Sequence, residues 1–114
     1  MKRTYRDYIL DILTSIQEIE EFVEGMDFEE FVTDRKTINA VIRSLEVIGE
    51  AVKKVPSEIR TKYPEIPWKY IAGMRDKLIH EYHSVDLEII LEVIEKEIPS
   101  LKPKFAKILE ELKE

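Results

Sequence analysis

The segment Tyr5–Val23 decides the fold class, and it reads YRDYILDILTSIQEIEEFV. Its aromatic and aliphatic residues recur at steps of three and four: Tyr5, Tyr8, Ile9, Ile12, Ile16, Ile19 and Val23. These steps bring side chains to one face of an α-helix, which has about 3.6 residues per turn. The segment therefore predicts an amphipathic helix whose apolar stripe faces a core.

The same period predicts two further long helices. One begins near Asp34 and ends at Pro56, because proline cannot continue a helix without losing a hydrogen bond. The other has Pro67 as its first residue and runs through Tyr82. Gly25 is the predicted stop signal of the first helix.

The remaining segments are shorter. Asp27 and Ser57 are predicted caps of two short helices. Asp86 begins a fourth main helix, and Pro99 separates it from a last one over residues 101–112. No segment shows sustained alternation of period two, so we expect an all-α fold, an up-and-down bundle of four or five helices.

Length and composition narrow the class of protein. The chain has 114 residues, no cysteine and three glycines, which favours a single domain over residues 1–114 without disulfides or thiolate metal sites. No apolar run approaches the roughly 18–20 residues of a membrane span, and the N-terminus lacks a signal-peptide pattern. We therefore expect a cytoplasmic protein.

Charge is distributed unevenly. The chain has 18 Lys and Arg against 24 Asp and Glu, a net charge of -6, which argues against broad binding of nucleic acid. All charged residues from Asp11 to Glu30 are acidic, whereas Glu58 to His80 holds five basic and three acidic ones. If RNA binds, the second stretch is the expected place.

The segment MRDKLIHEYH, residues 74–83, contains both histidines of the chain, His80 and His83. Imidazole titrates near neutral pH and can move a proton, and the guanidinium of Arg75 can grip a phosphate. Together they suit cleavage of a phosphodiester without a metal ion: one group moves the proton of a ribose 2′-hydroxyl, and the other stabilises charge on the phosphoryl oxygens.

Helix geometry constrains this site. Arg75 and Tyr82 lie within about 20° of each other on an ideal helix, but His80 is about 140° from Arg75. Either the helix distorts near His80, or a second subunit completes the site. Gly73 could let another helix approach closely.

The stretch RDKLIHEY, residues 75–82, resembles the R-x4-H-x-Y motif of HepT toxins in the HEPN superfamily. The resemblance extends over nearly the whole chain. It also covers DRKT at 34–37, AVIRSLEVIGEA at 40–51, YPEIPW at 63–68 followed by IAGMR at 71–75, VDL at 85–87 and IP at 98–99.

The resemblance implies a HEPN-like helical bundle that forms a homodimer, with the motif at the interface. It implies a metal-independent endoribonuclease without a cofactor, in which Arg75 and His80 are catalytic and Asp76 supports them. It also implies the toxin of a two-gene module, whose MntA-like minimal nucleotidyltransferase antitoxin attaches AMP to Tyr82. It assigns no role to His83.

Two other readings of the whole chain stay open. The protein could be a non-catalytic binding partner of a nucleotidyltransferase, which the net charge of -6 favours. It could also be a structural helical dimer, although this leaves the motif unexplained.

Two local alternatives are open as well. Arg43, Glu46 and Glu50 share a helix face, so either Arg43 pairs with Glu46, which we favour, or a glutamate pairs with Arg75 across the bundle. Trp68 could stack on a base, but we expect it in the core.

Overall fold

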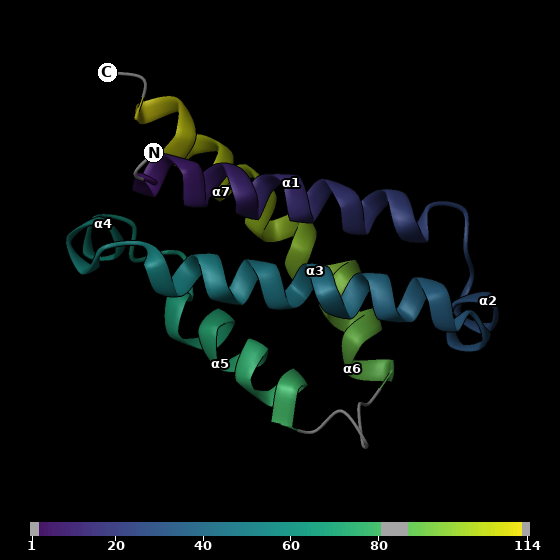
Figure 1. Ribbon diagram of the computed structural model, residues 1–114. Helices are drawn as coiled ribbons and strands as arrows, with labels where there is room; N and C mark the ends of the chain where they lie inside the picture. Colours follow the sequence, from purple (N-terminus) through teal and green to yellow (C-terminus); the bar gives the residue numbers. More distant parts are fainter. Residues whose placement is uncertain (1–2, 81–86, 113–114) are drawn as a thin grey trace.

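The computed structural model describes residues 3–80 and 87–112, and within α5 it describes only the backbone of residues 75 and 77–80. These ranges are helical with short connections and contain no strand, as the sequence predicted (Figure 1). The elements are α1 (Tyr5–Val23), α2 (Phe28–Thr33), α3 (Arg35–Lys54), α4 (Ser57–Lys62), α5 (Trp68–His80), α6 (Leu87–Glu92), the π-helical segment η2 (Val93–Glu97) and α7 (Ile98–Glu111).

The long helices run up and down. Helix α1 lies antiparallel along α3, α5 packs on α3, and α7 packs on α1, so that the C-terminal end of α7 returns to the start of α1 (Figure 1). The predicted stripe of α1 is at the centre of this arrangement, because Ile9, Ile12, Ile16 and Ile19 are fully buried. Each buried aliphatic side chain of this size contributes about 1.5–3 kcal/mol through removal from water.

Most helix ends follow the predicted signals, with exceptions at Ser57 and Pro99. Gly25 has a φ of 77° after the last residues of α1, a conformation that glycine adopts without steric cost. The Asp27 carboxylate accepts a hydrogen bond of 2.8 Å from the backbone N–H of Glu30. Ser57 does not cap α4, because it lies inside the helix and Pro56 takes the capping position. The Pro56 carbonyl accepts the first helical bonds instead.

The predicted break at Pro99 is wrong. Residues 87–111 form one continuous helical run, with the wider π-turn η2 directly before Ile98. The N–H of Ile98 donates to the carbonyl of Val93, five residues back. Pro99 has no N–H, and its ring would clash with the carbonyl four residues back in a regular α-helix. The wider turn accommodates the proline without ending the helix, so the bundle has four long helical units in its described part.

Trp68 belongs to the core, as we favoured. Its side chain is 7% exposed, its Nε1–H donates to the carbonyl of Tyr63 at 3.0 Å, and its ring meets that of Phe105 edge-on at 5.7 Å. The Tyr63 hydroxyl donates in turn to the carboxylate of Glu111. These contacts hold the connection between α4 and α5 against α7.

Within the described ranges, no helix combines the length and the apolar character that spanning a membrane requires.

The Tyr63–Glu111 contact predicts a dependence of stability on alkaline pH. The hydrogen bond to Glu111, together with burial, raises the pKa of Tyr63 to about 12. An unfolded tyrosine has a pKa of about 10. The contribution of this hydrogen bond to the free energy of unfolding is therefore complete below a pH of about 10, and it is lost as the pH rises toward 12.

We expect Tyr63→Phe to lower the free energy of unfolding by about 1 kcal/mol at neutral pH, and this difference from wild type should shrink above a pH of about 10. Urea unfolding of both proteins across this range measures it. A difference that stays constant up to a pH of about 11.5 would contradict the shifted pKa.

Candidate active site

Helix α5 carries both residues of the predicted catalytic pair, Arg75 and His80. The helix is unbroken from Trp68 to His80, so the distortion near His80, one of the two alternatives from the sequence, is not seen in the backbone up to that residue. Five residues of regular helix separate their positions by about 140° around the axis. Within one copy of α5, the two positions therefore lie on different sides of the helix.

Asp76, the residue after Arg75, ties α5 to α3. Its carboxylate accepts a hydrogen bond of 2.9 Å from Nζ of Lys53, near the C-terminal end of α3. Both side chains are partly exposed, 37% for Lys53 and 46% for Asp76, so the pair adds little to stability. Its effect is geometric, since it joins the two helices one residue from Arg75.

The sequence contained no signal for Lys53, because 23 residues separate it from Asp76. Tyr82 and His83 lie outside the described residues, and their predicted roles remain predictions. Pairing of Arg75 with Glu46 or Glu50 also remains a prediction, because the Arg75 side chain is not described.

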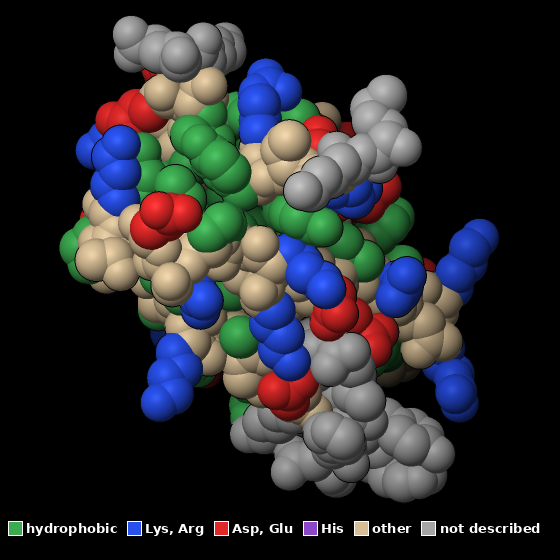
Figure 2. Space-filling model, turned by 60° about the vertical axis from the view of Figure 1, so that its left-hand side comes forward, with side chains coloured by type: hydrophobic (Ala, Val, Ile, Leu, Met, Phe, Trp, Pro, Cys, Tyr) green, Lys and Arg blue, Asp and Glu red, His purple; other side chains and the backbone are tan. Residues whose placement is uncertain are grey.

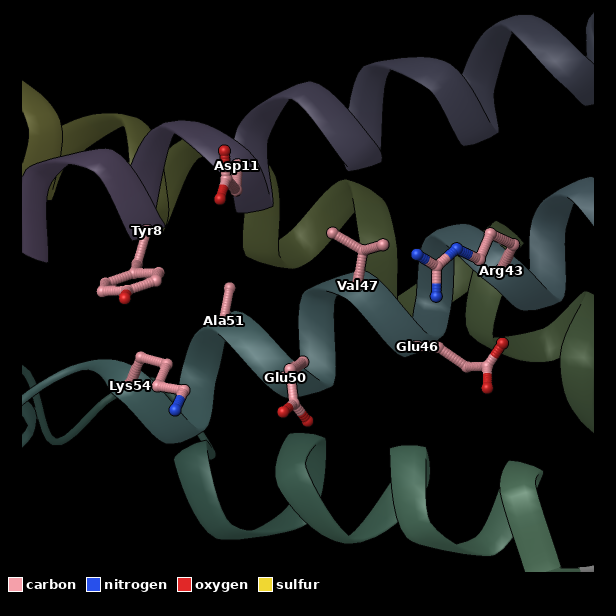
Figure 3. A pocket seen from close by; sticks show the side chains of 8 residues that line it. All are labelled: Tyr8, Asp11, Arg43, Glu46, Val47, Glu50, Ala51 and Lys54. Carbon is pink, nitrogen blue, oxygen red and sulfur yellow. The ribbon is translucent and has the colours of Figure 1, made fainter. Parts of the chain in front are cut away.

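A groove of about 360 Å³ lies between α1 and α3, beside α5 (Figure 3). The carboxylates of Glu46 and Glu50 point from α3 toward α5, whereas Tyr8 and Asp11 enter from α1. The favoured pair of Arg43 and Glu46 is not formed within the described part of the chain. Their charged ends point apart, and the Arg43 side chain is exposed.

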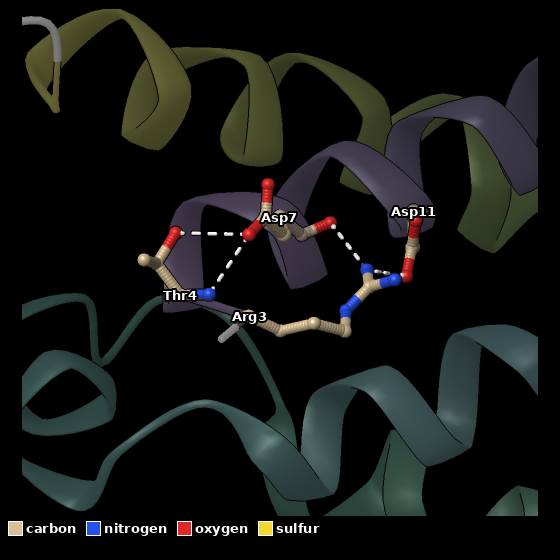
Figure 4. A network of polar contacts seen from close by, with 4 residues as sticks. All are labelled: Arg3, Thr4, Asp7 and Asp11. Atoms are coloured by element: carbon tan, nitrogen blue, oxygen red, sulfur yellow. Dashed lines mark hydrogen bonds and ion pairs between the residues drawn. The ribbon is translucent and has the colours of Figure 1, made fainter. Parts of the chain in front are cut away.

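An ordered network at the start of α1 borders this groove (Figure 4). The Arg3 guanidinium pairs with Asp11 and lies 4.9 Å from the ring centre of Tyr8. The Thr4 backbone N–H donates to the Asp7 carboxylate at 2.8 Å, and this bond lowers the pKa of Asp7. Acidic and basic groups are mixed around the groove, so it presents no dominant field to a chain of phosphates.

Among the described residues, no group of three or more His, Asp or Glu side chains could hold a metal ion.

Comparison with known proteins identifies the family. A family model described as "Ribonuclease HepT-like" matches residues 12–108. The chain belongs to the HepT-like ribonuclease family. The matched range extends from the first buried turns of α1 to the last buried turn of α7 and includes the Arg75–Tyr82 motif, so the resemblance inferred from the sequence is confirmed at the level of the family.

Several relatives are similar over almost their whole length. "Probable ribonuclease HepT" of Thermococcus cleftensis is 50% identical over 108 residues, 95% of this chain and 98% of the relative. "Putative RNase MJ0125" of Methanocaldococcus jannaschii is 50% identical over 113 residues, 99% and 97% of the two chains. "Putative RNase TTE0752" of Caldanaerobacter subterraneus is 50% identical over 111 residues, 97% and 99%. No solved structure matches the chain.

Gly73 lies on an open part of α5. It is exposed, and a Cβ atom built on it would meet nothing within 4 Å among the described residues. No described helix of the same chain makes the close approach that the sequence suggested.

Replacing Gly73 tests this surface. In an isolated chain, Gly73→Ala should raise the free energy of unfolding by about 0.5–1 kcal/mol, because alanine loses less backbone entropy in a helix. Thermal and urea unfolding, followed by circular dichroism, measure the change. A lower stability, with a change in the apparent mass by sedimentation, would show that another copy packs closely on Gly73.

Proposed function

We propose that this protein is the toxin of a toxin–antitoxin module and cleaves RNA without a metal ion, with Arg75 and His80 as its catalytic residues. The observation that carries the proposal is the pair's position on the unbroken helix α5 of a chain in the HepT-like ribonuclease family. No other described part of the chain contains a histidine.

The chemistry needs only these two side chains. A neutral His80 imidazole takes the proton of a ribose 2′-hydroxyl, and the 2′-oxygen bonds to the adjacent phosphorus. The bond from phosphorus to the 5′-oxygen breaks, and the proton passes to that oxygen. Arg75 stabilises the charge that develops on the other phosphoryl oxygens. The expected products are a 2′,3′-cyclic phosphate and a 5′-hydroxyl.

A homodimer would solve the geometric problem of the single helix. Because α5 separates Arg75 and His80 by about 140°, we propose that two copies of α5 face each other across a two-fold axis. Arg75 of one copy then lies near His80 of the other. Asp76 is a positioning residue in this proposal, because its ion pair with Lys53 fixes α5 against α3 beside Arg75.

The second candidate is a helical partner of a nucleotidyltransferase that does not cut RNA. The net charge of -6 supports it, since like charges repel the RNA backbone. Cleavage assays decide between the two functions.

The two histidines provide a matched test of the enzyme. With EDTA present, the wild type should cleave single-stranded RNA. His80→Ala should slow this cleavage by about 10²–10⁴-fold, because it removes the group that moves the proton. His83→Ala is the control and should keep the activity. Cleavage products are followed by gel electrophoresis, and helicity by circular dichroism. Undiminished cleavage by the helical His80→Ala protein would rule out this mechanism.

Regulation by an MntA-like minimal nucleotidyltransferase is the further part of this proposal. The Tyr82 hydroxyl would attack the α-phosphorus of ATP and release pyrophosphate, which leaves AMP on the tyrosine. Each AMP adds a negative phosphodiester and a base close in sequence to Arg75, and this charge competes with RNA phosphate for the guanidinium.

Mass spectrometry tests the modification directly. After incubation with ATP and the nucleotidyltransferase encoded beside its gene, the protein should gain the mass of one or more AMP groups at Tyr82 and lose its ribonuclease activity. Tyr82→Phe should remain unmodified and active. AMP found on another residue, with Tyr82 unmodified, would contradict the assignment.

A further inference from the structure

A second groove, the α4–α5 groove, lies between α4 and the start of α5 and has a volume of about 550 Å³. It is separate from the groove between α1 and α3. It contains two cations, two hydroxyls and an exposed aromatic ring, and none of the described residues that line it is acidic. Its polar lining is formed by Ser57, Arg60, Thr61, Lys69 and Tyr70.

The two cations of the groove are available to a ligand. Nε of Arg60 is buried and lacks a hydrogen-bond partner in the described structure. Because Nε itself is shielded, the groove offers a ligand the positive charge of Arg60, which lines it, and not this donor. Lys69 is exposed, and neither cation forms an ion pair within residues 3–80 and 87–112.

The surroundings of the groove are basic. Residues 53–70 contain five Lys or Arg and two Glu, a net charge of +3 in a chain whose total is -6. Figure 2 brings the α4 end of the molecule forward and shows Lys and Arg side chains spread over this face, with Asp and Glu side chains among them. Figure 1 shows the C-terminal half of α1 and α2 at the other end, and these segments, with the turn between them, hold the acidic residues from Glu18 to Glu30. A polyanion is therefore attracted to the α4 end.

Tyr70 adds a surface for a base. Its side chain is 51% exposed, and its hydroxyl donates to the Glu97 carboxylate at 3.1 Å, which holds the ring in place. Unpaired bases of RNA commonly stack on such aromatic rings while cations contact the phosphates. The combination of phosphate and base contacts favours single-stranded RNA over a small inorganic anion.

The groove is aligned with the proposed catalytic histidine. Lys69 and His80 are eleven positions apart on α5, which places them within about 20° around the axis and about 16 Å apart along it. Gly73 lies between them on the same face, is exposed, and has no described residue within 4 Å of a Cβ atom built on it. Asp76 also lies on this face, but its charge is offset by Lys53.

We propose that the α4–α5 groove binds a single-stranded stretch of the RNA substrate away from the cleaved bond. Arg60 and Lys69 contact its phosphates, and Tyr70 stacks on a base. The strand then continues along the face of α5 toward His80. This inference rests on the proposed ribonuclease function, but RNA binding tests it separately from cleavage.

The test measures binding of a 2′-O-methylated RNA oligonucleotide, which cannot be cleaved by attack of the 2′-oxygen. Fluorescence anisotropy compares the wild type with the double variant Arg60→Gln/Lys69→Gln at several salt concentrations. The control, Lys36→Gln/Lys96→Gln, removes the same charge from exposed lysines outside the groove.

We expect the groove variant to bind at least about tenfold more weakly than the control. The slope of log affinity against log salt should fall by about 1.4, since each contact with a single-stranded phosphate contributes about 0.7. If the double variant fails to fold, Lys69→Gln alone, at an exposed position, should show about half of this change in slope. Equal affinity and slope for the folded groove and control variants would overturn the proposal.

A second pair of variants tests the aromatic contact. Tyr70→Ala should weaken binding about fivefold or more, whereas Tyr70→Phe, which keeps the ring and loses only the hydroxyl bond to Glu97, should weaken it less. Equal binding by Tyr70→Ala and wild type would remove base stacking from the proposal.

Cleavage kinetics separate this inference from the proposed function. With cleavable RNA, the groove variant should raise KM and leave kcat unchanged, because its contacts are the same before and during the reaction. Binding through the groove by a wild type that cleaves no RNA would leave the groove proposal intact and refute the ribonuclease function. A wild type that binds no RNA would overturn the groove proposal itself.

Discussion

The packing of α3 between α1 and α5 is the constraint on which the rest of the structure depends. A helix covered on two sides needs an apolar surface wider than one stripe. The buried residues of α3 meet this need: Val41, Ser44, Leu45, Ile48, Gly49, Ala51 and Val52. Because several of them are small, neighbouring helices can approach α3 without large side chains in between. The charged residues of α3 are left at its margins.

The position of α5 on α3 determines which residues are available for function. One side of α5 packs through Ile71, which is 3% exposed, and its margin is joined to α3 by Asp76 and Lys53. Gly73 lies on the open side. One face of α5 therefore packs against the core. The rest of the same helix carries the proposed catalytic residues, the proposed surface for a second copy and part of the proposed path of the RNA.

Acidic and basic residues are separated along the chain, and the fold keeps some of them apart in space. The net charge of -6 suggests a poor binder of nucleic acid, yet the charges are not evenly mixed, because every charged residue from Asp11 to Glu30 is acidic. The connection from the end of α3 through α4 to α5 is basic. Exposed charges more than about 8–10 Å apart are largely screened from each other at physiological salt. A local basic surface can therefore attract RNA although the net charge of the whole chain is negative.

The sequence alone determined the helical class, the bounds of α1 and the family, because periodic apolar residues and a local motif need no knowledge of distant contacts. It misjudged Pro99, whose effect depends on whether the preceding turn can widen. It also misjudged Arg43 and Glu46, because spacing on a helix does not determine side-chain direction. Only the tertiary structure brought Lys53 to Asp76 and placed Arg60 and Lys69 at one groove. These pairs belong to different helices, and their proximity is decided by how the helices pack.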